Sequence, residues 1–341
     1  MTHLCLEMPS FEFFQNQENT LQQVTHLELV GGGRTNTTLL PIHLSRWSKL
    51  NSLSWRSGLE ISDMNPSLMD QGFLENLKLT LSSLVLIRDQ TDPTRTLPSW
   101  FWEEIPSLRH LETLEISGFD MSDVSLSYLF RPVNTVLLDT SDKLHVSIKD
   151  QHAWPPKLKH LDLSHNSIKG AVPEQLLREL EYLDLSNNNL NGTLPPMSIP
   201  SNITVLKLQR NNLTGPLDSS FGTLMPQLQE LYLSDNQFVD TVPQSFAKLS
   251  NLGHVQLFGN DLDGNIEFVC TSGEKPKTYL VDSSVQCSCC IDVSKKTYDN
   301  FLLVASPDGT IAIVEDGRGD GPTPPPMKSK TRLRGYPHSF P

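Results

Sequence analysis

The chain has 341 residues and a formal net charge of −12. This acidic balance argues against a general nucleic-acid binder. No apolar run approaches 18 residues, so the sequence predicts no transmembrane helix. The start, MTHLCLEMPS, lacks the basic and apolar regions of a signal peptide. On these grounds the protein is either intracellular or its true beginning is missing from this sequence.

Residues 1–23 form an N-terminal flank, and short alternating segments follow it. The flank holds Leu4, Leu6 and several phenylalanines, and we expect it to cover the exposed end of the first structural repeat. The segments that follow alternate apolar and polar residues, which indicates short, half-buried strands. These segments begin at Val24, Leu50, Leu81, Leu111 and Val133.

Long gaps between the early segments, around residues 56–110, indicate insertions. One of them carries the sequence PSWFWEEIP. Insertions in repeat proteins form loops on one face, and that face often binds a partner. Trp100 and Trp102 are therefore candidate partner-binding residues. The alternative is that these aromatic side chains pack in the core beneath the repeats.

Residues 158–266 carry the most regular pattern in the chain. Five copies of L-x-x-L-x-L-x-x-N-x-L begin at Leu158, Leu180, Ile203, Leu228 and Leu252. Their asparagines recur every 22 to 25 residues, at Asn166, Asn188, Asn211, Asn236 and Asn260. A period in the twenties with this motif predicts a solenoid, in which stacked coils bury one continuous core.

Each position of the motif has a structural role in such a coil. The leucines are expected to point inward. The asparagine is expected to form hydrogen bonds with backbone groups that strand pairing leaves without partners. The glycine and proline that follow let the chain turn onto the opposite, convex side. There Pro173 and Pro243 are predicted to open one or two turns of helix, over EQLLREL and QSFAKL.

Four cysteines follow the last regular repeat: Cys270, Cys287, Cys289 and Cys290. They could supply four thiolates to a metal, but structural zinc sites favour cysteine pairs two to four residues apart, and C-x-C-C fits this poorly. Two disulfides fit better, with three possible connectivities. A bond between the adjacent Cys289 and Cys290 would be strained, so we expect one of this pair to join Cys270. Cys5 is then left over.

The C-terminal part of the chain departs from the repeat pattern. Residues 293–316 predict a β-hairpin whose turn is Pro307-Asp308-Gly309. Residues 317–341 are rich in proline and glycine, carry several basic residues, and are expected to be a disordered tail.

Strand residues that point away from the leucines are the best candidates for a binding surface. Lys207, Tyr232 and Phe258 depart from the small polar residues that usually fill these positions, and exposed aromatic side chains favour contact with a partner. The same surface is predicted to include Tyr182, Gln256, Asp162 and Asp184.

Four N-glycosylation sequons begin at Asn36, Asn191, Asn202 and Asn212. Such sites suit a secreted protein. Because the chain is rich in Asn, Ser and Thr, they support secretion only weakly.

The motif as it stands in NSIKGAVP and NNLNGTLP resembles the plant-type leucine-rich repeat class. The C-terminal QCSCCIDV resembles the Cys-rich cap of leucine-rich repeat proteins from diatoms and related algae. The resemblance implies an α/β solenoid with a curved, parallel, concave sheet of about ten short strands and convex loops and short helices. The solenoid would cover residues 24–268 and the Cys-rich cap residues 269–292. Members of this group are similar to receptor-like ectodomains and receptor-like kinases, and many are surface or secreted proteins.

No catalytic signature stands out in the sequence, since G-x-x-x-x-G-K-[ST], H-E-x-x-H and G-x-S-x-G are all absent. We therefore predict a non-catalytic recognition module without cofactor or metal. Its concave face would hold a protein, a peptide or a glycan, at the cell surface or outside the cell. The alternatives are an inhibitor of a secreted hydrolase and a cytoplasmic scaffold.

Overall fold

The structure is a computed structural model that describes part of the chain. The described residues are 3–7, 23–30, 48–56, 74, 77–87, 97, 99–122, 154–270, 278–292, 301–305 and 311–315. The chain divides into two units, Met1–Lys295 and Lys296–Pro341.

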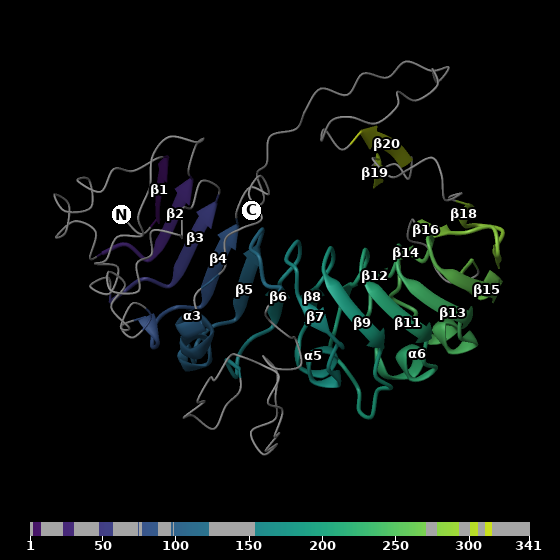
Figure 1. Ribbon diagram of the computed structural model, residues 1–341, viewed down its shortest axis with the longest axis horizontal. Helices are drawn as coiled ribbons and strands as arrows, with labels where there is room; N and C mark the ends of the chain where they lie inside the picture. Colours follow the sequence, from purple (N-terminus) through teal and green to yellow (C-terminus); the bar gives the residue numbers. More distant parts are fainter. Residues whose placement is uncertain are drawn as a thin grey trace. The chain divides into compact units, whose positions relative to one another are not determined.

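A 12-stranded parallel sheet, here called the main sheet, runs through the first unit (Figure 1). Each coil contributes one strand, and each strand pairs with the strand of the next coil. This pairing confirms the predicted solenoid. In spatial order the strands are β1 (His3–Glu7), β2 (His26–Val30), β3 (Ser52–Arg56), β4 (Ser83–Ile87), β5 (Thr113–Ser117), β6 (His160–Asp162), β8 (Tyr182–Asp184), β10 (Val205–Lys207), β12 (Glu230–Tyr232), β14 (His254–Gln256), β16 (Thr278–Val281) and β18 (Ile291–Asp292).

The main sheet departs from the sequence prediction at one internal position. β5 pairs directly with β6, with Leu114 opposite Leu161. No strand from the segment at Val133 can therefore stand between them, and that expectation is wrong. The segment itself lies outside the described residues.

The main sheet also extends beyond both predicted ends of the solenoid. β1 comes from the flank of residues 1–23 and continues the parallel pairing instead of only covering the first coil. β16 and β18 come from the predicted Cys-rich cap and continue it at the other end. Backbone pairing thus carries on where the leucine motif has stopped.

A second parallel sheet of six strands was not anticipated from the sequence. It forms where the chain leaves the asparagine turn, over the residues that read N-L-N-G-T in one copy. Its strands are, in order, β17 (Val285–Gln286), β15 (Asp261–Asn265), β13 (Gln237–Thr241), β11 (Asn212–Pro216), β9 (Asn189–Thr193) and β7 (Lys169–Gly170).

Short helices follow the strands in several coils. α5 and η5 begin directly after Pro173 and Pro243, as predicted, because proline has a fixed φ and needs no N–H partner at a helix start. The helical segments are α3 (Ser99–Glu104), η4 (Ile105–Ser107), α5 (Glu174–Glu179), α6 (Ser220–Leu224), η5 (Gln244–Lys248) and η6 (Glu267–Val269).

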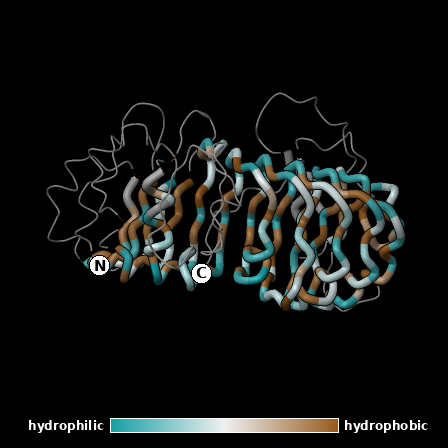
Figure 2. Tube along the Cα trace, turned by 60° about the horizontal axis from the view of Figure 1, so that its bottom comes forward, coloured by the Kyte–Doolittle hydropathy of each residue, from teal (hydrophilic) through white to brown (hydrophobic). Residues whose placement is uncertain are grey.

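The core of the first unit is one continuous cluster of apolar side chains that runs from coil to coil. Along the trace in Figure 2, hydrophobic segments recur from one strand to the next. Leu161, Leu183, Leu206 and Leu231, at equivalent positions, are at most 1% exposed. Since each strand lends only two or three apolar side chains, a coil becomes stable only through its neighbours.

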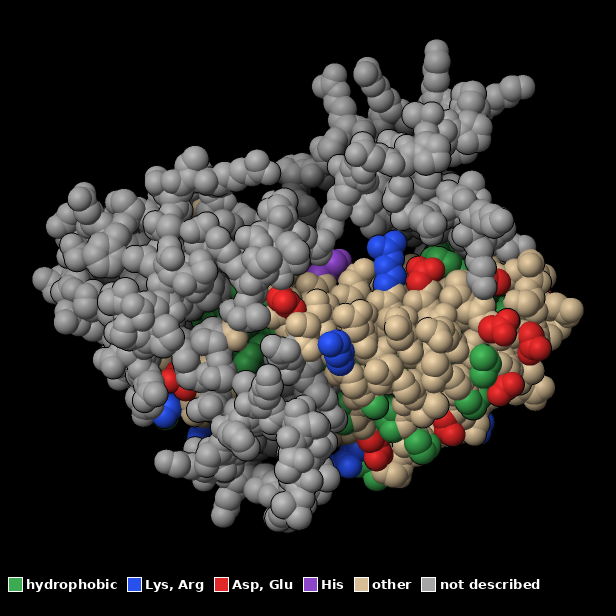
Figure 3. Space-filling model, viewed as in Figure 1, with side chains coloured by type: hydrophobic (Ala, Val, Ile, Leu, Met, Phe, Trp, Pro, Cys, Tyr) green, Lys and Arg blue, Asp and Glu red, His purple; other side chains and the backbone are tan. Residues whose placement is uncertain are grey.

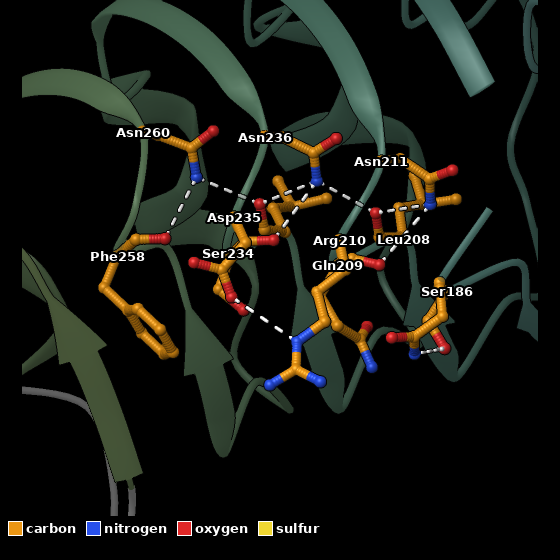
Figure 4. Close-up of polar contacts among 12 residues, drawn as sticks. Ser186, Leu208, Gln209, Arg210, Asn211, Ser234, Asp235, Asn236, Phe258 and Asn260 are labelled. Carbon is orange, nitrogen blue, oxygen red and sulfur yellow. Dashed lines mark hydrogen bonds and ion pairs between the residues drawn. The ribbon is translucent and has the colours of Figure 1, made fainter. Parts of the chain in front are cut away.

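The asparagines of the motif form a ladder of hydrogen bonds between coils (Figure 4). The side-chain amide of Asn188 donates to the carbonyl oxygens of Leu163 and Leu185, at 2.9 and 3.0 Å. Its Oδ1 accepts the backbone N–H of Ile168 at 3.0 Å. The same pattern recurs at Asn166, Asn211, Asn236 and Asn260. Each asparagine therefore satisfies buried backbone groups of its own coil and of the preceding one.

Two backbone positions in each regular coil have positive φ. One directly precedes the ladder asparagine and is held by His165, Asn187, Arg210, Asp235 and Gly259. The other position lies four residues after the ladder asparagine. It is glycine in four coils, at φ between 80° and 100°. In the fifth coil this second position is Asp240, with φ 68°. Left-handed backbone is costly for a residue that carries a Cβ.

Two disulfides close the C-terminal end of the first unit. They join Cys270 to Cys289 and Cys287 to Cys290. The first spans 19 residues and ties the turn η6 to the segment before β18. Such a cross-link stabilises mainly by restricting the unfolded chain.

The second unit contains a two-stranded antiparallel hairpin, β19 (Phe301–Ala305) and β20 (Ile311–Glu315). This is the hairpin expected for residues 293–316. Residues 317–341 lie outside the described part of the chain.

The Asp240 position predicts a stabilising substitution. Asp240→Gly should raise the free energy of unfolding by about 0.5 kcal/mol, because relief of the left-handed backbone exceeds the added flexibility of the unfolded chain. Chemical denaturation of both proteins measures this difference.

Gly215→Ala at the equivalent position is the control. It should lower stability by at least about 1 kcal/mol, because a Cβ there would lie 2.6 Å from Cγ2 of Thr193 at a φ of 81°. A loss of stability in Asp240→Gly would contradict this account of the coil.

Candidate functional site

The candidate site is the face of the main sheet that points away from the leucine core, here called the open face. On strands β6 to β14 it consists of the first and third residue of each strand, and strand pairing sets these residues side by side. The first row is His160, Tyr182, Val205, Glu230 and His254, and the second row is Asp162, Asp184, Lys207, Tyr232 and Gln256.

Tyr182 and Lys207 form the centre of the open face. The rings of His160 and Tyr182 stack, with centroids 4.0 Å apart and planes 10° from parallel. The ammonium of Lys207 donates to the Tyr182 hydroxyl at 3.0 Å and lies 3.7 Å from Oδ2 of Asp184. It also lies 5.1 Å from the centre of the Tyr182 ring and 5.8 Å from that of Tyr232. Both distances allow cation–π attraction.

Tyr232 lies next to Lys207 in the second row. Its hydroxyl donates to Oε2 of Glu230 on the same strand, at 3.0 Å. Burial and this carboxylate raise the pKa of the Tyr232 hydroxyl above its usual range. Burial and the carboxylate of Asp184 raise that of Tyr182 in the same way. Both phenols therefore stay neutral hydrogen-bond donors over the physiological pH range.

Three carboxylates stand next to one another on neighbouring strands. Glu115 on β5 is opposite Asp162 on β6, which is opposite Asp184 on β8. Asp162 and Asp184 each accept the backbone N–H two residues further on, at 2.9 Å. This bond explains why aspartate suits the position structurally.

Burial and proximity change the protonation of this row of carboxylates. Burial and the neighbouring Asp184 raise the pKa of Asp162 to about 7. Burial also raises the pKa of Glu115, against the opposing effect of Arg56. Lys207 is the cation in direct contact with Asp184 among the described residues. The row is therefore an acidic strip beside an aromatic and cationic centre.

His160 is held in its neutral form. Burial lowers the pKa of its imidazole, and Lys207 adds to this effect against the carboxylate of Asp184. The ring thus serves as a flat stacking surface for Tyr182 at neutral pH.

On the face of the molecule shown in Figure 3, acidic side chains recur across the described part of the chain.

Two family models match the regular half of the chain. One, described as "Leucine rich repeat", covers residues 201–262, and the other, "Leucine Rich repeats (2 copies)", covers residues 156–198. The chain is a leucine-rich repeat protein.

Curated relatives of this leucine-rich repeat protein are receptors and receptor-like proteins. Toll-like receptor 2 type-2 of Gallus gallus is 30% identical over 155 residues, or 45% of the chain. Receptor-like protein EIX2 of Solanum lycopersicum is 30% identical over 147 residues, or 42% of the chain. The chain has homology to both groups, and its aligned part makes up only 16% and 14% of these two proteins. No resemblance to diatom or algal proteins emerges from these matches.

Solved structures agree on the fold. A TDR receptor matches 84% of the chain with a TM-score of 0.50 and 21% identity, over 48% of its own length. The plant peptide hormone receptor RGFR1, in complex with RGF2, matches 84% with a TM-score of 0.50 and 18% identity, over 44% of its length. Within the described parts of this leucine-rich repeat protein, no helix has the length and apolar character needed to cross a membrane.

The sequence-predicted site residues fall into different environments. Tyr182, Lys207, Tyr232 and Asp184 come together at the centre of the open face. Asp162 lies beside them, Gln256 is opposite Tyr232 on β14, and Phe258 is half-buried two residues beyond Gln256. Glu115, His160 and Glu230 belong to the same surface.

The side chain of Trp102 is packed in the core. Trp102 lies on α3, is 6% exposed and belongs to the core cluster, where its ring meets Phe101 edge to face at 5.3 Å. Trp102 therefore follows the alternative prediction of packing in the core rather than that of an exposed contact residue. Trp100 lies on the same helix, and its side chain is outside the described residues.

The cysteines and sequons also have defined positions. The sulfur atoms of Cys270, Cys287 and Cys289 lie within 4.8 Å of one another, but all three are bonded in disulfides and offer no thiolate to a metal. Asn191, Asn202 and Asn212 are exposed, while Asn36 lies outside the described residues.

The raised pKa of Asp162 predicts a pH dependence of stability. Since its folded-state pKa of about 7 lies above the unfolded value near 3.9, folding favours the protonated form. Protonated Asp162 therefore stabilises the folded state fully below about pH 4, and this stabilisation is lost as the pH rises through about 7.

Asp162→Asn removes this titration and keeps the acceptor for Ser164. The wild type should lose free energy of unfolding between pH 5 and pH 8, and Asp162→Asn should lose about 1–2 kcal/mol less. This difference is smaller than the free energy that corresponds to the whole pKa shift of Asp162, because neighbouring carboxylates share the proton. Urea denaturation at several pH values measures the effect, with the exposed Asp261→Asn as control. Parallel pH profiles for wild type and Asp162→Asn would refute it.

Proposed function

We propose that this leucine-rich repeat protein is a non-catalytic, receptor-like binding protein. Its open face holds an extended segment of a peptide or protein partner. The observation that carries the proposal is the contact of Lys207 with Tyr182 and Asp184, next to Tyr232. Half-buried aromatic rings with fixed polar tips are the kind of surface on which binding energy concentrates.

The charges of the open face favour a partner segment that presents a basic side chain. Glu115, Asp162 and Asp184 supply three carboxylates in a row. Lys207 contacts Asp184 and Arg56 acts on Glu115, which leaves Asp162 between them as the place for a further cation. An arginine or lysine placed over Asp162 would favour its charged form and lower its pKa again. Binding would then release a proton and tighten as the pH rises from 5 to 8.

The relatives support the receptor-like assignment and a location at the cell surface or outside the cell. Both curated relatives named above carry receptor names, and the peptide hormone receptor shares the fold. The two disulfides suit an oxidising compartment, which disfavours the cytoplasmic scaffold.

A displayed peptide library tests the proposal without a known partner. Random 12-residue peptides are selected on the full chain at pH 7.5, and the enriched sequences are read out. The open face should enrich peptides with lysine or arginine next to an apolar or aromatic residue. Enrichment of peptides that lack basic residues would contradict the proposal.

The strongest peptide is then measured against variants by calorimetry. Asp162→Asn combined with Asp184→Asn should weaken binding tenfold or more, as expected for the loss of charge-assisted contacts. Tyr232→Ala should weaken it as well. Asp261→Asn, on β15 of the other sheet, should bind like the wild type. Equal affinity of the peptide for the double variant and the wild type would contradict a binding site on the open face.

A further inference from the structure

A small pocket lies away from the open face, beside helix α5. It encloses about 280 Å³, slightly below the range of pockets for drug-sized ligands and suited to a group of monosaccharide size. Its wall includes Trp154 and Pro155 before β6, Gln175 and Arg178 of α5, and Asn202 before β10. Three successive coils thus contribute to it.

One residue in the pocket wall suits a sugar. Trp154 is half-buried against the apolar core and lines the pocket. The C–H face of a pyranose packs on an indole ring, because the aromatic face carries partial negative charge. Gln175 and Arg178 add polar side chains to the same wall.

The same pocket wall carries an attachment point for a sugar. Asn202 is exposed and begins the sequon Asn202-Ile203-Thr204. Ile203 is fully buried and anchors this segment to the core, while the Thr204 hydroxyl donates to the carbonyl oxygen of Glu181 at 2.8 Å. The asparagine is thus held at the rim while its amide remains open to solvent.

We propose that Asn202 carries an N-linked glycan whose first N-acetylglucosamine packs into this pocket. The sugar ring lies against Trp154, beside the polar side chains of Gln175 and Arg178. Attachment forms the bond between Nδ2 of Asn202 and C1 of the sugar. It breaks the bond from C1 to the diphosphate of a polyprenyl carrier, and Nδ2 loses one proton. The cell's oligosaccharyltransferase supplies this reaction.

Two other sequons provide internal comparisons. Asn191 on β9 and Asn212 on β11 are exposed and lie opposite each other in the second sheet. Neither lines the pocket. A glycan at either position would project from that sheet without an aromatic ring of this pocket beneath it.

The test is the rate of enzymatic glycan removal from the protein isolated from its own cells. Peptide-N-glycosidase in ¹⁸O-labelled water converts each released asparagine to a mass-labelled aspartate, so mass spectrometry follows each site separately. Asn202 should be occupied, and its glycan should be released at least fivefold more slowly from the folded than from the denatured protein. At Asn191 or Asn212, where occupied, folding should slow release less.

Variants of Trp154 separate stacking from general protection. In folded Trp154→Ala, the glycan at Asn202 should be released about as fast as from the denatured protein. In Trp154→Phe its release should stay slow. An unmodified Asn202, or equal release rates in the folded and denatured wild type, would overturn the proposal even if Trp154→Ala fails to fold. Peptide binding on the open face is measured independently, so either proposal can fail alone.

Discussion

The hydrogen bonds of the ladder asparagines are the constraint on which the regular part of this protein depends. At each turn the chain leaves a parallel strand and exposes backbone groups that no sheet can pair. One side chain with both a donor and an acceptor solves this problem for two coils at once. Asn211, for example, donates to carbonyl oxygens of Leu185 and Leu208 and accepts the N–H of Leu190. Leaving such buried groups unsatisfied costs about 1–3 kcal/mol each, which is large against the stability that one short coil can supply.

The ladder also determines what the open face can do. Because it fixes the stacking of coils, it fixes the register in which Asp162, Asp184, Lys207 and Tyr232 stand beside one another. Three neighbouring carboxylates are an unfavourable arrangement that a flexible surface would relax by moving apart. Here the backbone holds them in place, and burial, together with the neighbouring carboxylate of Asp184, raises the pKa of Asp162. A partner with a basic group gains from that prearranged charge, since the protein has already met the cost of assembling it.

The sequence was sufficient where local chemistry and the repeat period agree. The strands from β6 to β14, the role of the asparagines and the helix starts after Pro173 and Pro243 follow from the motif alone. The sequence was insufficient where the backbone pairing of strands alone determines which segments join a sheet. Val133 begins a segment with the right alternation, yet β5 and β6 pair with each other. β1 and β16 carry no full copy of the motif, and the second sheet forms where the motif indicates only a turn. For Trp102 the sequence left both an exposed loop and core packing open, and the side chain is buried. The candidate site was partly visible in Lys207 and Tyr232. The pairing of Glu115 with Asp162 was not visible, because the sequence indicated a further strand, from the segment at Val133, between theirs.

Native-state hydrogen exchange of wild type and Asn211→Ala tests the central claim most directly. The account predicts that the backbone amides of Ile168, Leu190, Leu213 and Phe238, which the ladder asparagines accept, are among the slowest to exchange in the wild type. In Asn211→Ala the amide of Leu190 and amides in the coils on both sides should exchange at least tenfold faster, while the exposed Asn212→Ala should match the wild type. Acceleration confined to Leu190, or fast exchange of these amides in the wild type, would contradict the view that this ladder joins the coils and holds the open face in register.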